Sequence, residues 1–154
     1  MDNSGPFAWG IGGKKYRLFG TDHSCGYWVR LHTANKTEAP TFVEKSIAEF
    51  KALTGNELRF IRADSDSIFD TSHEMQDLYT QAKIKATFSS PYDQSQSSVA
   101  ENGIKKLNRD VRTVMKASGA PAHLWPEADD YTAFTCTTTF LPRRGPTGPS
   151  PATP

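Results

Sequence analysis

The sequence predicts a mixed α/β domain in which helices pack over one sheet. Short aromatic and β-branched segments alternate with longer segments whose apolar residues recur at helical spacing. The composition, with 36% hydrophobic and 23% charged residues, is typical of a globular protein and excludes a mainly disordered chain. A length of 154 residues suits one domain, which we expect over residues 1–141, followed by a disordered proline-rich tail over 142–154.

Strands are predicted where β-branched and aromatic residues gather in short runs. Residues 16–21 (YRLFGT) and 27–32 (YWVRLH), with turn-forming residues 24–26 between them, predict a β-hairpin. Residues 58–63 (LRFIRA) and 84–88 (IKATF) predict two further strands. The N-terminal MDNSGP segment is expected to begin the first strand, so five segments supply the sheet.

Helices are predicted from apolar spacing and from their end signals. The segment 37–53 has apolar residues near helical spacing and is followed by Gly-Asn, which is a stop signal. Residues 72–82, a long segment that begins at Val99, and residues 122–135 predict three further helices. The polar, serine-rich residues 89–98 predict a long loop before the third helix.

Several function classes are excluded by what the sequence lacks. Cys25 and Cys136 are far apart and form no CxxC pair, and the histidines are scattered, so neither a disulfide framework nor a zinc module is expected. No secretory signal and no segment of transmembrane length is present, so we expect an intracellular protein without a membrane partner. The net charge is only +1, so DNA binding would require positive charge concentrated on one surface.

Three acids on different predicted elements form a candidate metal site. Asp2 lies in the first strand region, Asp64 ends the strand over 58–63, and Glu101 lies on the long helix. Hard divalent cations need several oxygen ligands, so a phosphoryl-transfer site requires carboxylates from different elements. We therefore expect these three acids to converge at one edge of the sheet. The alternative is that they are ordinary surface acids among the 17 in the chain.

A row of charges is predicted along the long helix. At about 100° per residue, one narrow stripe contains Glu101, Lys105, Arg109, Arg112 and Lys116, while the apolar residues occupy another face. A carboxylate at the head of a row of cations suits a metal site that receives a polyanionic backbone. The alternative is a solvated helix face with an ordinary acid–base pair four residues apart.

A set of strings in a fixed order resembles the integrase core of copia-type retrotransposons, a branch of the retroviral integrase superfamily. In that family one strand carries D-x-x-G-P, a later strand ends in R-S-D-N-G-x-E-F, and a helix opens with P-Y-T-P-Q-Q-N-G-V-A-E-R. The resemblance covers residues 1 to about 142. The matching strings here are MDNSGPF, TDHSCGYWVRLHTANKTEA, FIRADSDSIF, SSPYDQSQSSVAE, VRTVM and LWPEA.

The resemblance implies an RNase H-like fold, a mixed sheet flanked by helices, and a metal-dependent activity. Asp2, Asp64 and Glu101 match the family's three catalytic, metal-binding acids, and Asp22 matches a further recurrent acid on the hairpin. The implied reaction is a one-step polynucleotidyl transfer on DNA, comprising 3′-end processing and strand transfer. It uses two Mg²⁺ or Mn²⁺ ions and forms no covalent enzyme intermediate.

The resemblance also implies partners and a location. DNA is the expected partner: Tyr92 matches a DNA-contacting loop and Lys105 a helix position that touches the element's DNA end, while Arg109 and Arg112 continue the cationic stripe. Family cores dimerise through helices, so a homo-oligomer is expected, and a self-associating structural module is a third possible function. The implied location is the nucleus or a cytoplasmic particle.

Departures from the family pattern keep a second function open, a catalytically inactive relic that retains nucleic-acid binding or self-association. The Asn-Gly after the second acid is replaced by Ser65 and Asp66, and the family's Asn beyond Glu101 is Ile104. The segment 65–100 between the second and third acids is one residue longer than usual. Further differences are Ile68, Gln94, Ser97 and Ser98, and Asp2 lies so near the first residue that an N-terminally truncated core is expected.

Overall fold

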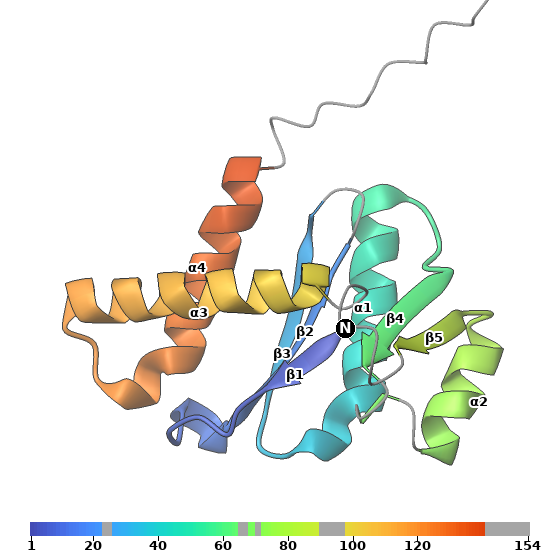
Figure 1. Ribbon diagram of the computed structural model, residues 1–154, viewed down its shortest axis with the longest axis horizontal. Coiled ribbons are helices and arrows are strands. Elements are labelled where there is room, and N and C mark those ends of the chain that lie inside the picture. The colour runs from blue at the N-terminus through green and yellow to red at the C-terminus, as the bar shows by residue number, and fades with distance from the viewer. Residues whose placement is uncertain (23–25, 65–67, 70–71, 90–97, 141–154) are drawn as a thin grey trace, which may run out of the picture.

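The computed structural model describes residues 1–22, 26–64, 68–69, 72–89 and 98–140 (Figure 1). The mixed α/β class predicted from the sequence is confirmed. The expectations for Cys25, for the Ser65–Asp66 pair, for the loop with Tyr92, and for the proline-rich tail fall outside the described residues.

The strands form two small sheets, where the sequence predicted one. In the first, β1 (Asp2–Ser4), β2 (Tyr16–Thr21) and β3 (Trp28–Thr33) pair antiparallel, which confirms the predicted hairpin. In the second, β4 (Phe60–Asp64) pairs in parallel with β5 (Lys85–Ser89). The N-terminal nitrogen of Met1 donates a hydrogen bond to the carbonyl oxygen of Arg62, which joins the sheets where β1 begins. All three residues of β1 pair with β2.

Four helices lie where helical spacing predicted them: α1 (Ala39–Thr54), α2 (His73–Gln81), α3 (Ser98–Ser118) and α4 (Trp125–Phe140). The predicted stop signal acts as expected, since Gly55 adopts a left-handed conformation after α1. At the start of α2, the Ser72 hydroxyl caps the helix by accepting from the Met75 N–H. The last predicted helix differs at its start, where a 3₁₀ turn, η3 (Ala122–Leu124), precedes α4. Two more 3₁₀ turns are η1 (Ile11–Gly13) and η2 (Lys36–Glu38).

The β1–β2–β3 sheet is covered on both faces, because side chains alternate along each strand. Leu18 and Val29 point to the face covered by α1 and belong to a core shared with α2, β4 and β5. Phe19 points to the other face and packs with the buried side of α3 and with α4. Figure 1 shows α3 and α4 on the opposite side of this sheet from α1. The predicted apolar stripe of α3 is confirmed by its members Ile104, Leu107, Val111, Val114 and Met115.

Within the described residues, every helix is too short or too polar to cross a lipid bilayer.

Candidate functional site

Asp2 faces the helix that carries Glu101. Asp2 pairs with Phe19 across β1 and β2, and directly paired residues point to the same face of a sheet. Phe19 packs against α3, so the Asp2 side chain projects toward α3 as well. Glu101 lies in the first turn of that helix and is half-buried. The fold therefore brings the first and third acids to one side of the sheet.

Asp64 reaches the same region from the second sheet. It is the last residue of β4 and is exposed to solvent. The hydrogen bond from Met1 to Arg62 places the start of β1 beside the end of β4, with Asp2 and Asp64 each close along the chain to that bond. Three elements that are distant in sequence thus deliver one carboxylate each to the junction of the two sheets.

The pKa of the Asp2 carboxyl is raised mainly by burial, and the two other acids contribute. Burial raises the pKa of the Asp2 carboxyl above its ordinary value, and the negative charges of Asp64 and Glu101 raise it further. The hydrogen bond from the Asn3 N–H, at 2.6 Å, acts in the opposite direction without cancelling the increase. Both other acids therefore lie within electrostatic range of Asp2, although the ligand oxygens of the three acids do not all lie within 4.8 Å of one another in the described structure.

Asp2→Asn should raise the melting temperature of the metal-free chain near neutral pH by about 1–3 °C. Because the folded carboxyl has a pKa above its ordinary value of 3.8, the folded state holds more protons than the unfolded state, and stability falls as pH rises through that window. Asparagine carries no charge and should remove this decline. Calorimetry from about pH 4 to 7 measures it.

The control for this measurement is Asp77→Asn, which makes the same chemical change at an exposed position of α2 and should leave the melting temperature unchanged. A melting temperature for Asp2→Asn that is equal to or below the wild-type value throughout the range would contradict the raised pKa of Asp2.

The predicted charge stripe lies on the exposed side of α3. Lys105 reaches back to Glu101 at 3.5 Å, in an ion pair whose side chains are 72% and 46% exposed. Such an exposed pair contributes little to stability, so the cation is available to a ligand. A shallow groove of about 420 Å³ follows this side of the helix, lined by Lys105, Asn108, Arg109, Arg112, Thr113 and Lys116. The local cationic surface that DNA binding would require is therefore present despite the net charge of +1.

A buried ion-pair network beneath α4 was not predicted from the sequence. Arg17 of β2 and Asp129 of α4 form an ion pair, with side chains only 1% and 0% exposed. His32 of β3 donates to the Asp129 carboxylate at 2.9 Å, and a second Arg17 nitrogen donates to the Asn108 side chain of α3 at 2.6 Å. The network ties α3 and α4 to the sheet. Its residues are ordinary polar types in the sequence, and only the pairing in space gives them a role.

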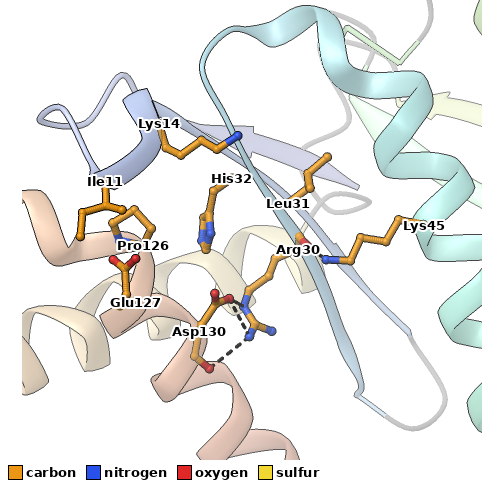
Figure 2. A pocket seen from close by; sticks show the side chains of 9 residues that line it. All are labelled: Ile11, Lys14, Arg30, Leu31, His32, Lys45, Pro126, Glu127 and Asp130. Carbon is orange, nitrogen blue, oxygen red and sulfur yellow. Dashed lines mark hydrogen bonds and ion pairs between the residues drawn. The ribbon is translucent and has the colours of Figure 1, made fainter.

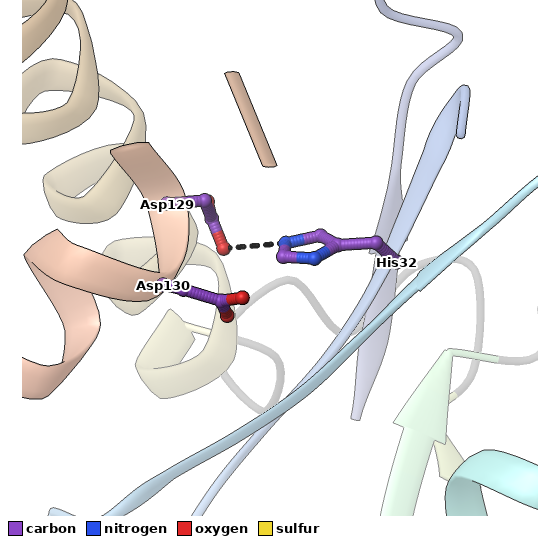
Figure 3. A group of neighbouring side chains, drawn as sticks. All are labelled: His32, Asp129 and Asp130. Carbon is purple, nitrogen blue, oxygen red and sulfur yellow. Dashed lines mark hydrogen bonds and ion pairs between the residues drawn. The ribbon is translucent and has the colours of Figure 1, made fainter. Parts of the chain in front are cut away.

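Three side chains of this network have the composition of a metal site. The ligand atoms of His32, Asp129 and Asp130 lie within 4.8 Å of one another. Figure 3 shows the two carboxylates of α4 pointing toward the His32 ring. However, Arg17 and Arg30 already neutralise the Asp129 carboxylate, the second at 3.6 Å. Burial alone would raise the pKa of Asp129, but the His32 hydrogen bond and the Arg17 charge outweigh it and lower the pKa. A cation here would have to compete with two guanidinium groups, so we interpret the group as a structural anchor.

A cavity of about 350 Å³ adjoins this network between η1, β3, α1 and α4 (Figure 2). Three of its lining residues are joined by hydrogen bonds: Arg30 donates to the Asp130 side chain at 3.0 Å, and Lys45 donates to the Arg30 carbonyl oxygen at 2.8 Å. None of the three predicted acids lines it. The cavity is therefore separate from the carboxylate cluster.

Two residues of α3 close to Glu101, Gly103 and Ile104, pack against the core beneath the predicted site. Ile104, which stands where the resembling family has Asn, is buried at 8% exposure in the core under the helix. Gly103, which the sequence did not single out, lies where the helix approaches Phe19. An isolated glycine inside a helical pattern was the available signal, because such a residue commonly marks close packing.

Neither protein-family models nor curated proteins give a match to this sequence.

Proposed function

We propose that this chain is the catalytic core of a copia-type retrotransposon integrase, with an RNase H-like fold, that acts as a metal-dependent polynucleotidyl transferase on DNA. The observation that carries the proposal is that Asp64 and Glu101 both lie within electrostatic range of Asp2, at the junction of the two sheets and beside the cationic face of α3. Three antiparallel strands, two parallel strands and helices on both faces support the RNase H-like part of the proposal.

The residues at the junction fit hard divalent cations. All three side chains are carboxylates, which are the ligands that Mg²⁺ and Mn²⁺ prefer, and they come from three different elements. Burial raises the pKa of Asp2, the charges of Asp64 and Glu101 contribute to the increase, and a bound cation would stabilise the ionised carboxylate. Asp2, Asp64 and Glu101 would thus hold two ions, which when bound activate a water or a DNA 3′-hydroxyl and stabilise the leaving oxygen.

The chain's other residues would bind and orient the nucleic acid. Lys105, Arg109 and Arg112 lie along one exposed side of α3, beginning one helical turn after Glu101. Cations in this row would neutralise successive phosphates and release counterions, which makes binding dependent on salt. The row would direct a DNA backbone toward the carboxylates, so that binding and chemistry share one helix.

Replacing Lys105, Arg109 and Arg112 together with glutamine should weaken DNA binding and flatten its salt dependence. Each lost phosphate contact should lower the slope of log K against log salt by about 1, so a decrease of about 2–3 is expected. Fluorescence anisotropy with a labelled duplex at several salt concentrations measures the slope. A triple variant of Lys51, Arg59 and Lys85, which are all exposed and lie outside α3, removes equal charge and should keep the wild-type slope. An equal decrease in both variants would favour a merely solvated face.

The second candidate function is a catalytically inactive relic that retains the fold and nucleic-acid binding. The observation that favours it is Ile104, because a buried apolar side chain replaces a polar one in the turn after Glu101. A Mg²⁺-dependent nicking assay on the wild-type chain distinguishes the two functions. DNA binding without nicking at any Mg²⁺ or Mn²⁺ concentration would support the relic.

A further inference from the structure

Gly103 destabilises α3 relative to alanine, because it lies inside the helix. A glycine inside a helix is less favourable than alanine by about 1 kcal/mol. Gly103 does not have the positive φ found at Gly55 and Gly119, so an ordinary L-residue could adopt its backbone conformation. The reason for glycine must therefore be the space around it.

The space beside Gly103 is filled by the side chain of Phe19, which is packed too tightly to move away. A Cβ atom at Gly103 would lie 3.0 Å from both Cε1 and Cζ of Phe19. Phe19 is fully buried, and its ring packs edge-on against Trp28 with centroids 5.6 Å apart. Close-packed interiors yield little to added atoms. An added methyl group would therefore move α3 away from β2 by a few tenths of an ångström.

The contact between Gly103 and Phe19 lies close to two of the predicted acids, Asp2 and Glu101. Phe19 is the sheet partner of Asp2, and Gly103 follows Glu101 by two residues in the same helix. Further along α3, Asn108 is held by Arg17 at 2.6 Å, so displacement at Gly103 would tilt the first turns about a fixed point. Metal and catalytic constellations tolerate displacements of only about 0.5 Å. The expected shift is of that order.

We propose that Gly103 is a positioning residue: its missing side chain lets α3 approach Phe19 closely enough for Glu101 to share cations with Asp2 and Asp64. This inference rests on the proposed metal-dependent function. It assigns a role to a residue that contacts neither metal nor DNA.

The test is Mn²⁺ binding to the full chain, measured by electron paramagnetic resonance alongside the melting temperature. Gly103→Ala should weaken Mn²⁺ binding by about tenfold or more, since the ligand geometry is disturbed, while the gain in helix propensity keeps the chain folded. For DNA strand transfer, kcat should fall by about the same factor while KM for DNA changes less than about threefold, because the cationic side of α3 is retained. Asn102→Ala, at the exposed neighbouring position, should change neither quantity.

A compensating variant separates positioning from general damage. Phe19→Leu combined with Gly103→Ala makes room for the methyl group and should restore Mn²⁺ affinity to within about threefold of wild type. If Gly103→Ala alone does not fold, the Mn²⁺ affinity of this double variant still tests the inference. Wild-type affinity in folded Gly103→Ala, or no recovery in a folded double variant, would overturn the inference while leaving the proposed function standing. A wild-type chain that binds no Mn²⁺ would remove the proposed function and this inference with it.

Discussion

Replacing Asp64 with asparagine should abolish Mg²⁺-dependent nicking and strand transfer, by at least about a thousandfold, while leaving the fold intact. Asp64 ends β4 at the junction of the two sheets, where it is exposed to solvent and its charge acts on Asp2. Asparagine has the same shape but lacks the charge that a hard cation requires. Because the side chain is exposed, its loss should cost little stability. Single-turnover cleavage of a labelled duplex, with circular dichroism as the folding check, measures both effects.

The outcome for Asp64→Asn separates the two proposed functions when it is compared with a matched variant. Asp77→Asn makes the identical change on an exposed turn of α2 and should retain wild-type activity. Retained nicking in Asp64→Asn would defeat the assignment of the carboxylates as metal ligands. If the wild type is inactive but binds DNA with a steep salt dependence, the chain is a relic with a working cationic face.

Much of the fold could be predicted because local signals control it. The hairpin of β2 and β3, the capping of α2 by Ser72 and the end of α1 at Gly55 each depend on residues within a few positions of one another. The division into two sheets could not be predicted in this way. It depends on how far β1 extends alongside β4, which is a contact between residues about 60 apart in the chain.

The candidate site could likewise be predicted only in part from the sequence. Asp2, Asp64 and Glu101 could be singled out through the resemblance to integrase motifs, because their places in the predicted elements alone left open that they are ordinary surface acids. The charge stripe followed from helical periodicity alone. The anchor of Arg17, His32 and Asp129 could not be found, because the chain separates Arg17 from Asp129 by more than 100 residues and no spacing rule links them. The role of Gly103 could not be predicted either, because it depends on Phe19, which lies opposite it in the folded chain.

The segregation of charge also explains how a nearly neutral chain could act on DNA. The net charge of +1 hides a cationic row on the outer side of α3 and a cluster of acids at its first turn. A phosphate backbone would be attracted by the row, whereas the acids would repel it unless cations bridge them. Divalent ions should therefore strengthen DNA binding at the carboxylate end more than along the rest of the helix.

The largest effect on stability is expected from Asp129→Asn, which should lower the free energy of unfolding by about 3–5 kcal/mol. Asp129 is fully buried and offsets the charge of Arg17, whose side chain is 1% exposed. Asparagine preserves the shape but leaves a guanidinium group buried without a counter-charge. Since the pKa of Asp129 is lowered by its partners, its contribution is fully present above the ordinary value of 3.8 and is lost as pH falls through the lowered pKa. Urea unfolding measured near pH 7 and near pH 3 follows this loss.

The adjacent acid provides the control, because it carries the same charge in a different environment. Asp130 pairs with Arg30 at 3.0 Å but its side chain is 61% exposed, so Asp130→Asn should cost less than about 1 kcal/mol. Replacing Arg17 with methionine and Asp129 with leucine together should recover much of the stability lost in Asp129→Asn, since no buried charge is then left unpaired. A cost for Asp129→Asn no larger than that for Asp130→Asn would show that the network does not anchor α4. The position of α3, which Arg17 also holds through Asn108, would then have to depend on apolar packing alone.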